Sequence, residues 1–415
     1  MLATLKNKNF ALLWTGGLIS MTGNWMLMAA LPFHVYAITN SALAASGILM
    51  AMVAPGIFFG SIAGVFVDRW DRKKVMVIVS SHQAGTILGL LLVRSAEWIW
   101  VIYLTVFLES TLKNFFGPAE GALLPNLVGE EHLVPANSLN ALNDNLARII
   151  GPAIGGLLLG MIGFQSVIWA DAASYLIAMV LIILIQADNT APVRESGREM
   201  DLKIDNSWVQ MWKEWLAGLR YIKHKRALTG LFITMGIALF GDAILSAILV
   251  VFVQQDLGFN AIEFGWLMTA RGLGGLGGGL LVGSVGQKFK PLQLISAGLL
   301  VTGASIFLML LRPSLAMMMI LLVMIGPALM AWLISLQAIG QKETEDAYRG
   351  RVFGAIGTST TFIMFFGSAI AGFMADQNGT FIFIAAAASF FMLAGLVSPA
   401  VFGNSIKDAP IPIKA

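Results

Sequence analysis

The sequence predicts an all-α integral membrane protein with twelve transmembrane helices in two six-helix bundles. Of its 415 residues 57% are hydrophobic and 12% are charged, whereas about a quarter of the residues of a soluble domain are charged. Twelve long apolar stretches run through the chain, and one polar segment divides them six and six. These observations indicate that lipid surrounds most of the molecule.

Each stretch is long enough to cross a bilayer core, which takes about 20 apolar residues in a helix. A transmembrane barrel would need alternating segments of about 10 residues, and these runs are continuously apolar. The first stretch lacks a small-residue cleavage site and is too long for a signal-peptide core, so we expect it in the mature protein. The predicted spans are residues 10–38, 42–67, 75–95, 98–118, 138–162, 165–186, 227–254, 260–287, 291–311, 313–340, 350–375 and 379–403.

The polar segment predicts three regions. Residues 1–187 form an N-terminal six-helix bundle, 188–226 a cytoplasmic linker with an interfacial helix, and 227–415 a C-terminal six-helix bundle. Aromatic and basic residues recur at helical spacing in the second part of the linker, as in helices that lie on a membrane surface. No G-x-x-x-x-G-K-[ST] loop occurs in the sequence, so we expect no ATPase in this chain.

The positive residues predict the orientation. Of the 26 Lys and Arg, only Arg94 and Arg312 lie at the predicted outer side, at the end of a span or in a loop, and three more, Lys113, Arg148 and Arg271, lie well inside spans. Because cytoplasmic loops are rich in Lys and Arg, we expect a multi-pass protein of the cell (inner) membrane with both termini in the cytoplasm. This distribution explains the net charge of +3 without nucleic acid. The chain has no cysteine, and we expect no cofactor and no metal.

Two motifs carry a family resemblance. The charged loop between the second and third spans resembles the pattern G-x-x-x-D-R-x-G-R-R/K of the major facilitator superfamily, with Asp71 in place of the second glycine. The fifth span contains a motif that resembles the pattern G-P-x-x-G-G of the same superfamily. The strings NFFGPAEGALLPNLV, ANSLNALNDNLARIIGPAIGG and YRGRVFG resemble its third drug-proton antiporter branch, the macrolide and enterobactin exporters. The motif residues are Gly64, Asp68, Arg69, Arg72 and Lys73 in the loop, and Gly151, Pro152, Gly155 and Gly156 in the span.

The resemblance implies roles for both motifs. Asp68 would face the positive amino end of another helix, where an anion is favoured, and the family implies the eleventh span, which begins near Arg349 and Arg351. The loop would then act as a cytoplasmic gate, and the glycine-proline motif would seal the path between the halves. The alternative is that the loop only obeys the positive-inside rule, which explains its basic residues but not Gly64 or Asp68.

Ionisable residues inside the spans mark candidate sites, because a charge at the centre of a membrane helix costs about 3 kcal/mol or more. Two pairs are four residues apart and share a helical face: Glu109 with Lys113, and Asp144 with Arg148. Each pair could also be structural and internally neutralised. The candidates, which lie away from the ends of the predicted spans, are Glu109, Lys113, Asp144, Arg148, Asp171, Asp242 and Arg271.

Asp242 is the first candidate for proton coupling and Glu109 the second. Asp242 lies mid-span with no basic residue three or four positions away in the sequence, which suits a group that binds and releases protons. A structural hydrogen bond is its alternative role. The expected substrate cavity has polar and adaptable apolar side chains, although the methionines could equally face lipid: Asn24, Met21, Met28, Lys113 and Ser246.

The sequence therefore predicts a transporter and not an enzyme. We expect a proton-coupled exporter of amphipathic organic compounds, similar to drugs, macrolides or siderophores, that works by alternating access. Its expected partners are a small organic substrate, protons and membrane lipids, and we expect a monomer. One alternative is a transporter or facilitator of lysophospholipid or another lipid without proton coupling, and a second is a non-transporting receptor or scaffold.

Overall fold

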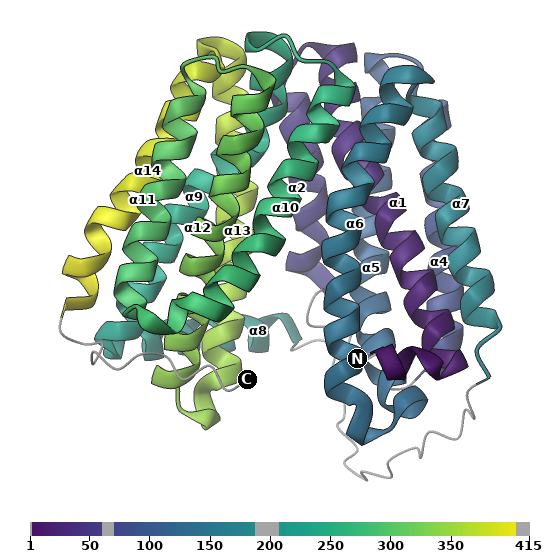
Figure 1. Ribbon diagram of the computed structural model, residues 1–415, viewed down its shortest axis with the longest axis horizontal. Coiled ribbons are helices and arrows are strands. Elements are labelled where there is room, and N and C mark those ends of the chain that lie inside the picture. The colour runs from purple at the N-terminus through teal and green to yellow at the C-terminus, as the bar shows by residue number, and fades with distance from the viewer. Residues whose placement is uncertain (1, 60–69, 187–206, 404–415) are drawn as a thin grey trace. The chain divides into compact units, whose positions relative to one another are not determined.

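A computed structural model describes residues 2–59, 70–186 and 207–403. In these ranges the chain forms thirteen α-helices (Figure 1). The predicted gate residues Gly64, Asp68 and Arg69 lie outside the described residues. Eight helices of the described part are long and apolar enough to cross a membrane.

The first half contains six long helices, each close to a predicted span. Helix α5 runs ten residues past its predicted end at 118 and holds Pro118 and Pro125 within it. Prolines are tolerated in membrane helices because neighbouring helices and side chains satisfy the freed backbone groups. The helices are α1 (Lys8–Thr39), α2 (Ala42–Phe59), α4 (Arg72–Leu88), α5 (Ile99–Val128), α6 (Leu133–Met161) and α7 (Phe164–Ile183).

The second half begins with a helix in the predicted linker and continues with six more. A π-helical turn, Phe252–Asp256, follows α9 directly. The helices are α8 (Ser207–His224), α9 (Arg226–Val251), α10 (Ala261–Val285), α11 (Pro291–Met309), α12 (Leu315–Glu343), α13 (Asp346–Asn378) and α14 (Thr380–Phe402).

The chain divides into two compact units. Unit 1 comprises Met1–Val193, Leu249–Gly272 and Gly372–Gln377, and unit 2 comprises Arg194–Ile248, Leu273–Ala371 and Asn378–Ala415. Short segments from the second half of the sequence thus group with unit 1. The three regions predicted from the sequence stay a prediction.

The core of unit 1 is two hydrophobic clusters with polar side chains between them. In unit 1, α1 packs against α6 and α7, and α4 packs against α5 and α7. One cluster includes Phe10 of α1 and Val79 of α4, and the other includes Met26 and Ile87 further along the same helices. Polar residues lie between these positions on each helix, which places a polar layer inside an apolar bundle.

Unit 2 holds the linker helix against α13. Trp215 Nε1 donates to Ser359 Oγ at 3.3 Å, and the rings of Tyr221 and Tyr348 stack with centroids 4.5 Å apart. The aromatic side of α8 therefore packs on protein. Its predicted place at the membrane surface stays a prediction.

Candidate functional site

The polar layer of unit 1 is built around Glu109 of α5. Its side chain is 8% exposed, and its Oε2 accepts a hydrogen bond from Gln83 Nε2 of α4 at 3.1 Å. The same amide nitrogen lies 3.4 Å from Tyr175 Oη of α7. Three helices thus contribute buried polar groups to one network.

Asp171 of α7 is the second carboxylate of the layer. It is 0% exposed, and Ser174 Oγ lies 3.3 Å from its Oδ1. Asp171 Oδ2 and Glu109 Oε1 are both buried and accept no hydrogen bond in the described part of the chain. Buried polar atoms are nearly always paired, so two such oxygens in one layer make this layer a candidate site.

Lys113 lies one helical turn from Glu109 on α5. Its side chain is exposed, whereas that of Glu109 is buried. Its Nζ donates to Asn24 Oδ1 of α1 at 2.5 Å. The ammonium also interacts electrostatically with Glu109, Asp171 and Asp144. Two predicted cavity residues, Asn24 and Lys113, are therefore brought together by the fold.

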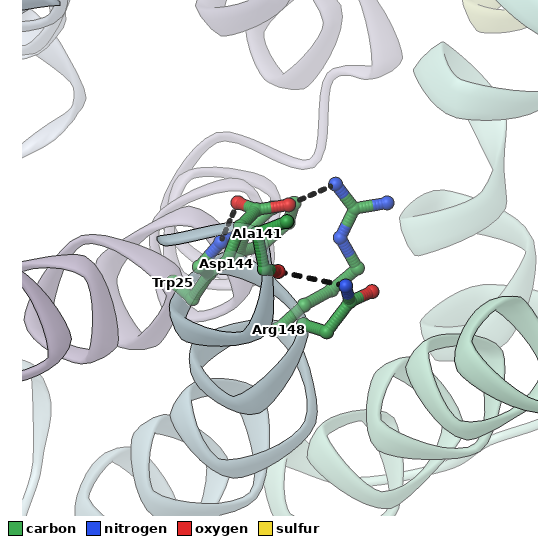
Figure 2. A network of polar contacts seen from close by, with 5 residues as sticks. Trp25, Ala141, Asp144 and Arg148 are labelled. Carbon is green, nitrogen blue, oxygen red and sulfur yellow. Dashed lines mark hydrogen bonds and ion pairs between the residues drawn. The ribbon is translucent and has the colours of Figure 1, made fainter. Parts of the chain in front are cut away.

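The Asp144 and Arg148 pair forms as its spacing predicts (Figure 2). Arg148 Nη2 donates to Asp144 Oδ2 at 2.8 Å, and Trp25 Nε1 donates to Asp144 Oδ1 at 3.4 Å. The guanidinium lies 4.9 Å from the centre of the Trp25 ring, a cation–π distance. The pair is neutral within itself and joins α6 to α1.

The glycine-proline motif marks close helix crossings in unit 1. A β-carbon at Gly151 would lie 2.8 Å from Thr22 O, and one at Gly155 would lie 2.5 Å from Met26 O, both on α1. At Gly156 it would lie 2.6 Å from Ala261 O. A β-carbon at Gly265 would meet the carbonyl oxygen of Pro152 at the same distance, 2.6 Å. Small residues are required here because the backbones approach so closely.

Two predicted gate residues bind backbone carbonyl groups of neighbouring helices. Arg72 Nη1 donates to Ala122 O at 2.8 Å. Lys73 Nζ donates to Ile183 O and Ile185 O, each at 2.8 Å. A cation at the carboxyl end of α7 is favoured by the helix dipole, so Lys73 also serves the packing of unit 1.

The second-half gate residues make contacts within their own helix. Arg349 Nη2 lies 2.6 Å from Asp346 Oδ1, and the guanidinium of Arg351 lies 5.8 Å from the centre of the Tyr348 ring. With Asp68 outside the described residues, the predicted latch between the loop and the eleventh span stays a prediction.

Other predicted site residues are spread over α9 and α1. Asp242 and Ser246 are half-buried on α9, in unit 2, and Met21 and Met28 are half-buried on α1, in unit 1. The roles of these four residues in coupling or in substrate binding stay predictions.

Three polar residues of unit 1 received no role from the sequence. Gln83 and Tyr175 are uncharged, and their only sequence signal is a polar group within an apolar span. Asp376 of α13 lies at the amino end of α2, where its carboxylate accepts hydrogen bonds from Ser41 Oγ at 2.7 Å and from the backbone N of Ala42 at 2.5 Å. Such contacts between distant segments leave no pattern in the sequence.

Comparison with known proteins agrees with this fold. The profile of the family described as transmembrane secretion effector matches residues 1–407. The chain is 25% identical to the MFS-type transporter YfiS of Bacillus subtilis over 94% of this chain and 92% of that protein. It is 23% identical to macrolide efflux protein A of Streptococcus pyogenes, over 89% of this chain and 90% of that protein. It is 26% identical to enterobactin exporter EntS of Shigella boydii, over 81% of this chain and 78% of that protein.

A solved structure has the same fold. The nucleoside transporter NupG, solved as a point mutant, superimposes with a TM-score of 0.77 at 13% identity. The match covers 95% of this chain and 100% of the NupG chain. At this identity the likeness concerns the fold alone, and it confirms the predicted all-helical membrane architecture.

Proposed function

The chain belongs to the transmembrane secretion effector family of the major facilitator superfamily, whose members are transporters and not enzymes, and we propose that it is a proton-coupled exporter of amphipathic organic compounds. The buried polar layer of unit 1 is the observation that carries this proposal. A carboxylate held inside an apolar bundle is the group that a proton-driven transporter needs, since such residues mark proton pathways in membrane proteins.

Coupling runs through Glu109 and Asp242 in this proposal. Glu109 is buried and hydrogen-bonded by Gln83, which holds its side chain in one orientation. Asp242 is half-buried on α9 and supplies an acidic group in the second half of the sequence. Alternating access would expose these carboxylates to one side of the membrane at a time.

The substrate class follows from the relatives and from the cavity residues. Two relatives are named as macrolide efflux and enterobactin export proteins. Asn24 and Lys113 offer polar contacts beside the half-buried Met21 and Met28, a combination that suits an amphipathic molecule. The positive-inside pattern supports an inner-membrane protein with both termini in the cytoplasm.

The test is transport in proteoliposomes with and without an imposed proton gradient. Macrolides, catecholate siderophores and lysophospholipids are supplied in turn, and substrate flux and internal pH are recorded together. We expect gradient-driven flux of a macrolide or siderophore in the native chain, and its loss in Glu109→Gln and Asp242→Asn. Glu131→Gln is the matched control because the Glu131 side chain is 84% exposed.

Two outcomes would contradict the proposal. Unchanged proton coupling in both acidic variants would remove Glu109 and Asp242 from the coupling path. Flux of lysophospholipid that does not depend on the gradient would instead support a lipid facilitator, the alternative that the sequence also allows.

A further inference from the structure

The polar layer of unit 1 contains two carboxylates where the proposed mechanism uses one. Glu109 of α5 and Asp171 of α7 are 8% and 0% exposed, and each has one oxygen that accepts no hydrogen bond in the described residues. The Gln83 amide that binds Glu109 also lies 3.4 Å from Tyr175 Oη, and Tyr175 is one turn from Asp171 on α7, so the two carboxylates share one layer and their charges act on each other. Asp171 therefore belongs to the same electrostatic unit as Glu109.

The charges around this pair do not balance. Within the described ranges, Glu109, Asp171 and Tyr175 are the titratable acids that face the layer, and Lys113 is the cation that acts on both carboxylates. Helices α1 and α4 contribute Asn24 and Gln83, which carry no charge. On the adjoining α6, Asp144 is already paired with Arg148.

The position of Lys113 leaves the negative charge uncompensated at close range. Its ammonium is hydrogen-bonded to Asn24 of α1 and not to either carboxylate. Two buried carboxylate ions beside one cation that is bonded elsewhere would be unfavourable, because both ions lose their hydration and repel each other. One bound proton removes the excess charge, as in pairs of carboxyl groups that share a proton.

We propose that Asp171 and Glu109 together hold one exchangeable proton, and that Lys113 displaces this proton to water by moving from Asn24 toward Glu109. Glu109 and Lys113 are four residues apart on one helix, so a rotamer change of Lys113 would bring its ammonium toward the Glu109 carboxylate. The inference rests on the proposed function for its role in transport, and it names Asp171 as a second proton-carrying residue of unit 1, beside Glu109.

The packing of α1 supports this link between the proton and the cavity. A β-carbon built at Gly23 would overlap Ser174 and the carboxylate of Asp171, so α1 passes directly over that acid. The next residue, Asn24, holds Lys113. Movement of α1 would therefore disturb the acid and the cation at the same time.

Infrared spectroscopy of the full chain in lipid nanodiscs tests the inference without transport. The C=O stretch of a protonated carboxylic acid is distinct from that of a carboxylate, and it is recorded while the buffer is taken from acid to alkaline. At neutral pH we expect a protonated-acid contribution in the native chain that changes in Asp171→Asn and in Glu109→Gln, and that is lost in the double variant. The exposed Glu131→Gln is the control and should leave the band unchanged.

The role of Lys113 has its own variant. In Lys113→Gln the cation is gone, so the band should persist to more alkaline buffer than in the native chain. Lys213→Gln, an exposed lysine of α8, is the matched control. If Asp171→Asn does not fold, Ser174→Ala removes the hydroxyl beside Asp171 Oδ1 and should also make the band persist.

The outcomes separate this inference from the proposed function. A band that is unchanged in the Asp171 and Glu109 variants would overturn the inference, even if proton-driven transport is intact. A band that behaves as expected in a protein whose flux ignores the proton gradient would overturn the proposed function and leave the shared proton established.

Discussion

Replacing Asp376 should loosen the amino end of α2. The Asp376 carboxylate accepts hydrogen bonds from Ser41 Oγ, the backbone N of Ala42 and the backbone N of Leu43, at 2.7, 2.5 and 3.3 Å. The next backbone N, of Ala44, donates to Ser41 Oγ at 3.1 Å. The first N–H groups of a helix have no partner within it, so Asp376 supplies partners that α2 lacks.

The magnitude follows from these contacts. Removing a side chain that caps a helix costs about 0.5–2 kcal/mol, and hydrogen bonds to a charged group reach about 1.5–3 kcal/mol each when buried. Asp376 is exposed, so we discount the larger range for solvent screening. Asp376→Ala should therefore lower the free energy needed to open the amino end of α2 by about 1–2 kcal/mol. This corresponds to a factor of about 5–30 in the opening equilibrium.

Hydrogen exchange measured by mass spectrometry checks this value. Amides of Ala42 and Leu43 should exchange about 5–30-fold faster in Asp376→Ala, and less so in Asp376→Asn, which keeps an acceptor. Glu131→Gln should leave these amides unchanged. Native protection of the Ala42–Leu43 peptide in the alanine variant would refute the reasoning.

Three further predictions address the helix crossing, the linker and the gate. Gly156→Ala should lower the free energy of unfolding by about 1–3 kcal/mol through overpacking, measured by tryptophan fluorescence. Gly117→Ala is the control and should not lower it, because a β-carbon there meets nothing within 4 Å. Equal stability of both variants would contradict the packing argument. Outside the spans, Lys225 Nζ lies 2.9 Å from Glu345 Oε1. Hydrogen bonds raise the pKa of Lys225, with Tyr221 contributing most and Glu345 next. Hydrogen bonds also lower the pKa of Glu345, with Lys225 contributing most and Tyr221 next. The pair should therefore stabilise unit 2 between about pH 4.3 and pH 10.4, the ordinary values of the two groups, and this small contribution should be lost on acidification below the first and on alkalinisation above the second; Glu345→Gln should flatten the pH dependence of unfolding, and an unaltered profile would show that the pair contributes nothing. Asp68→Asn should disturb conformational cycling more than substrate affinity, measured by distances between spin labels on cysteines introduced into this cysteine-free chain, and a change confined to binding would count against the gate.

The helices could be predicted well because their signal is local. Each transmembrane helix is a run of apolar residues whose length matches the bilayer, and the described helices begin within a few residues of the predicted spans. The observed end of α5 differs from the prediction because polar residues and prolines from position 118 onward weaken the apolar signal of the span. The helix continues through Pro118 and Pro125 to Val128.

The candidate site could be predicted only in part. The spacing of Asp144 and Arg148 predicted a pair, and the pair forms. The same spacing predicted that Glu109 and Lys113 share a face, and it could not show that Lys113 is hydrogen-bonded to Asn24 of α1. Spacing along one helix reports which side chains share a face, and the neighbouring helices decide which partner each side chain takes.

By itself the sequence determined that this chain spans the membrane, where its helices lie and which motifs place it in its family, because hydropathy and motifs are properties of short segments. The tertiary structure alone decided that Asp171 lies in the layer of Glu109 and Gln83, and that Asp376 caps α2. These contacts join residues far apart in the chain, and they depend on how each helix is rotated about its axis. Packing sets that rotation, since it buries the apolar faces and turns the few polar groups toward one another.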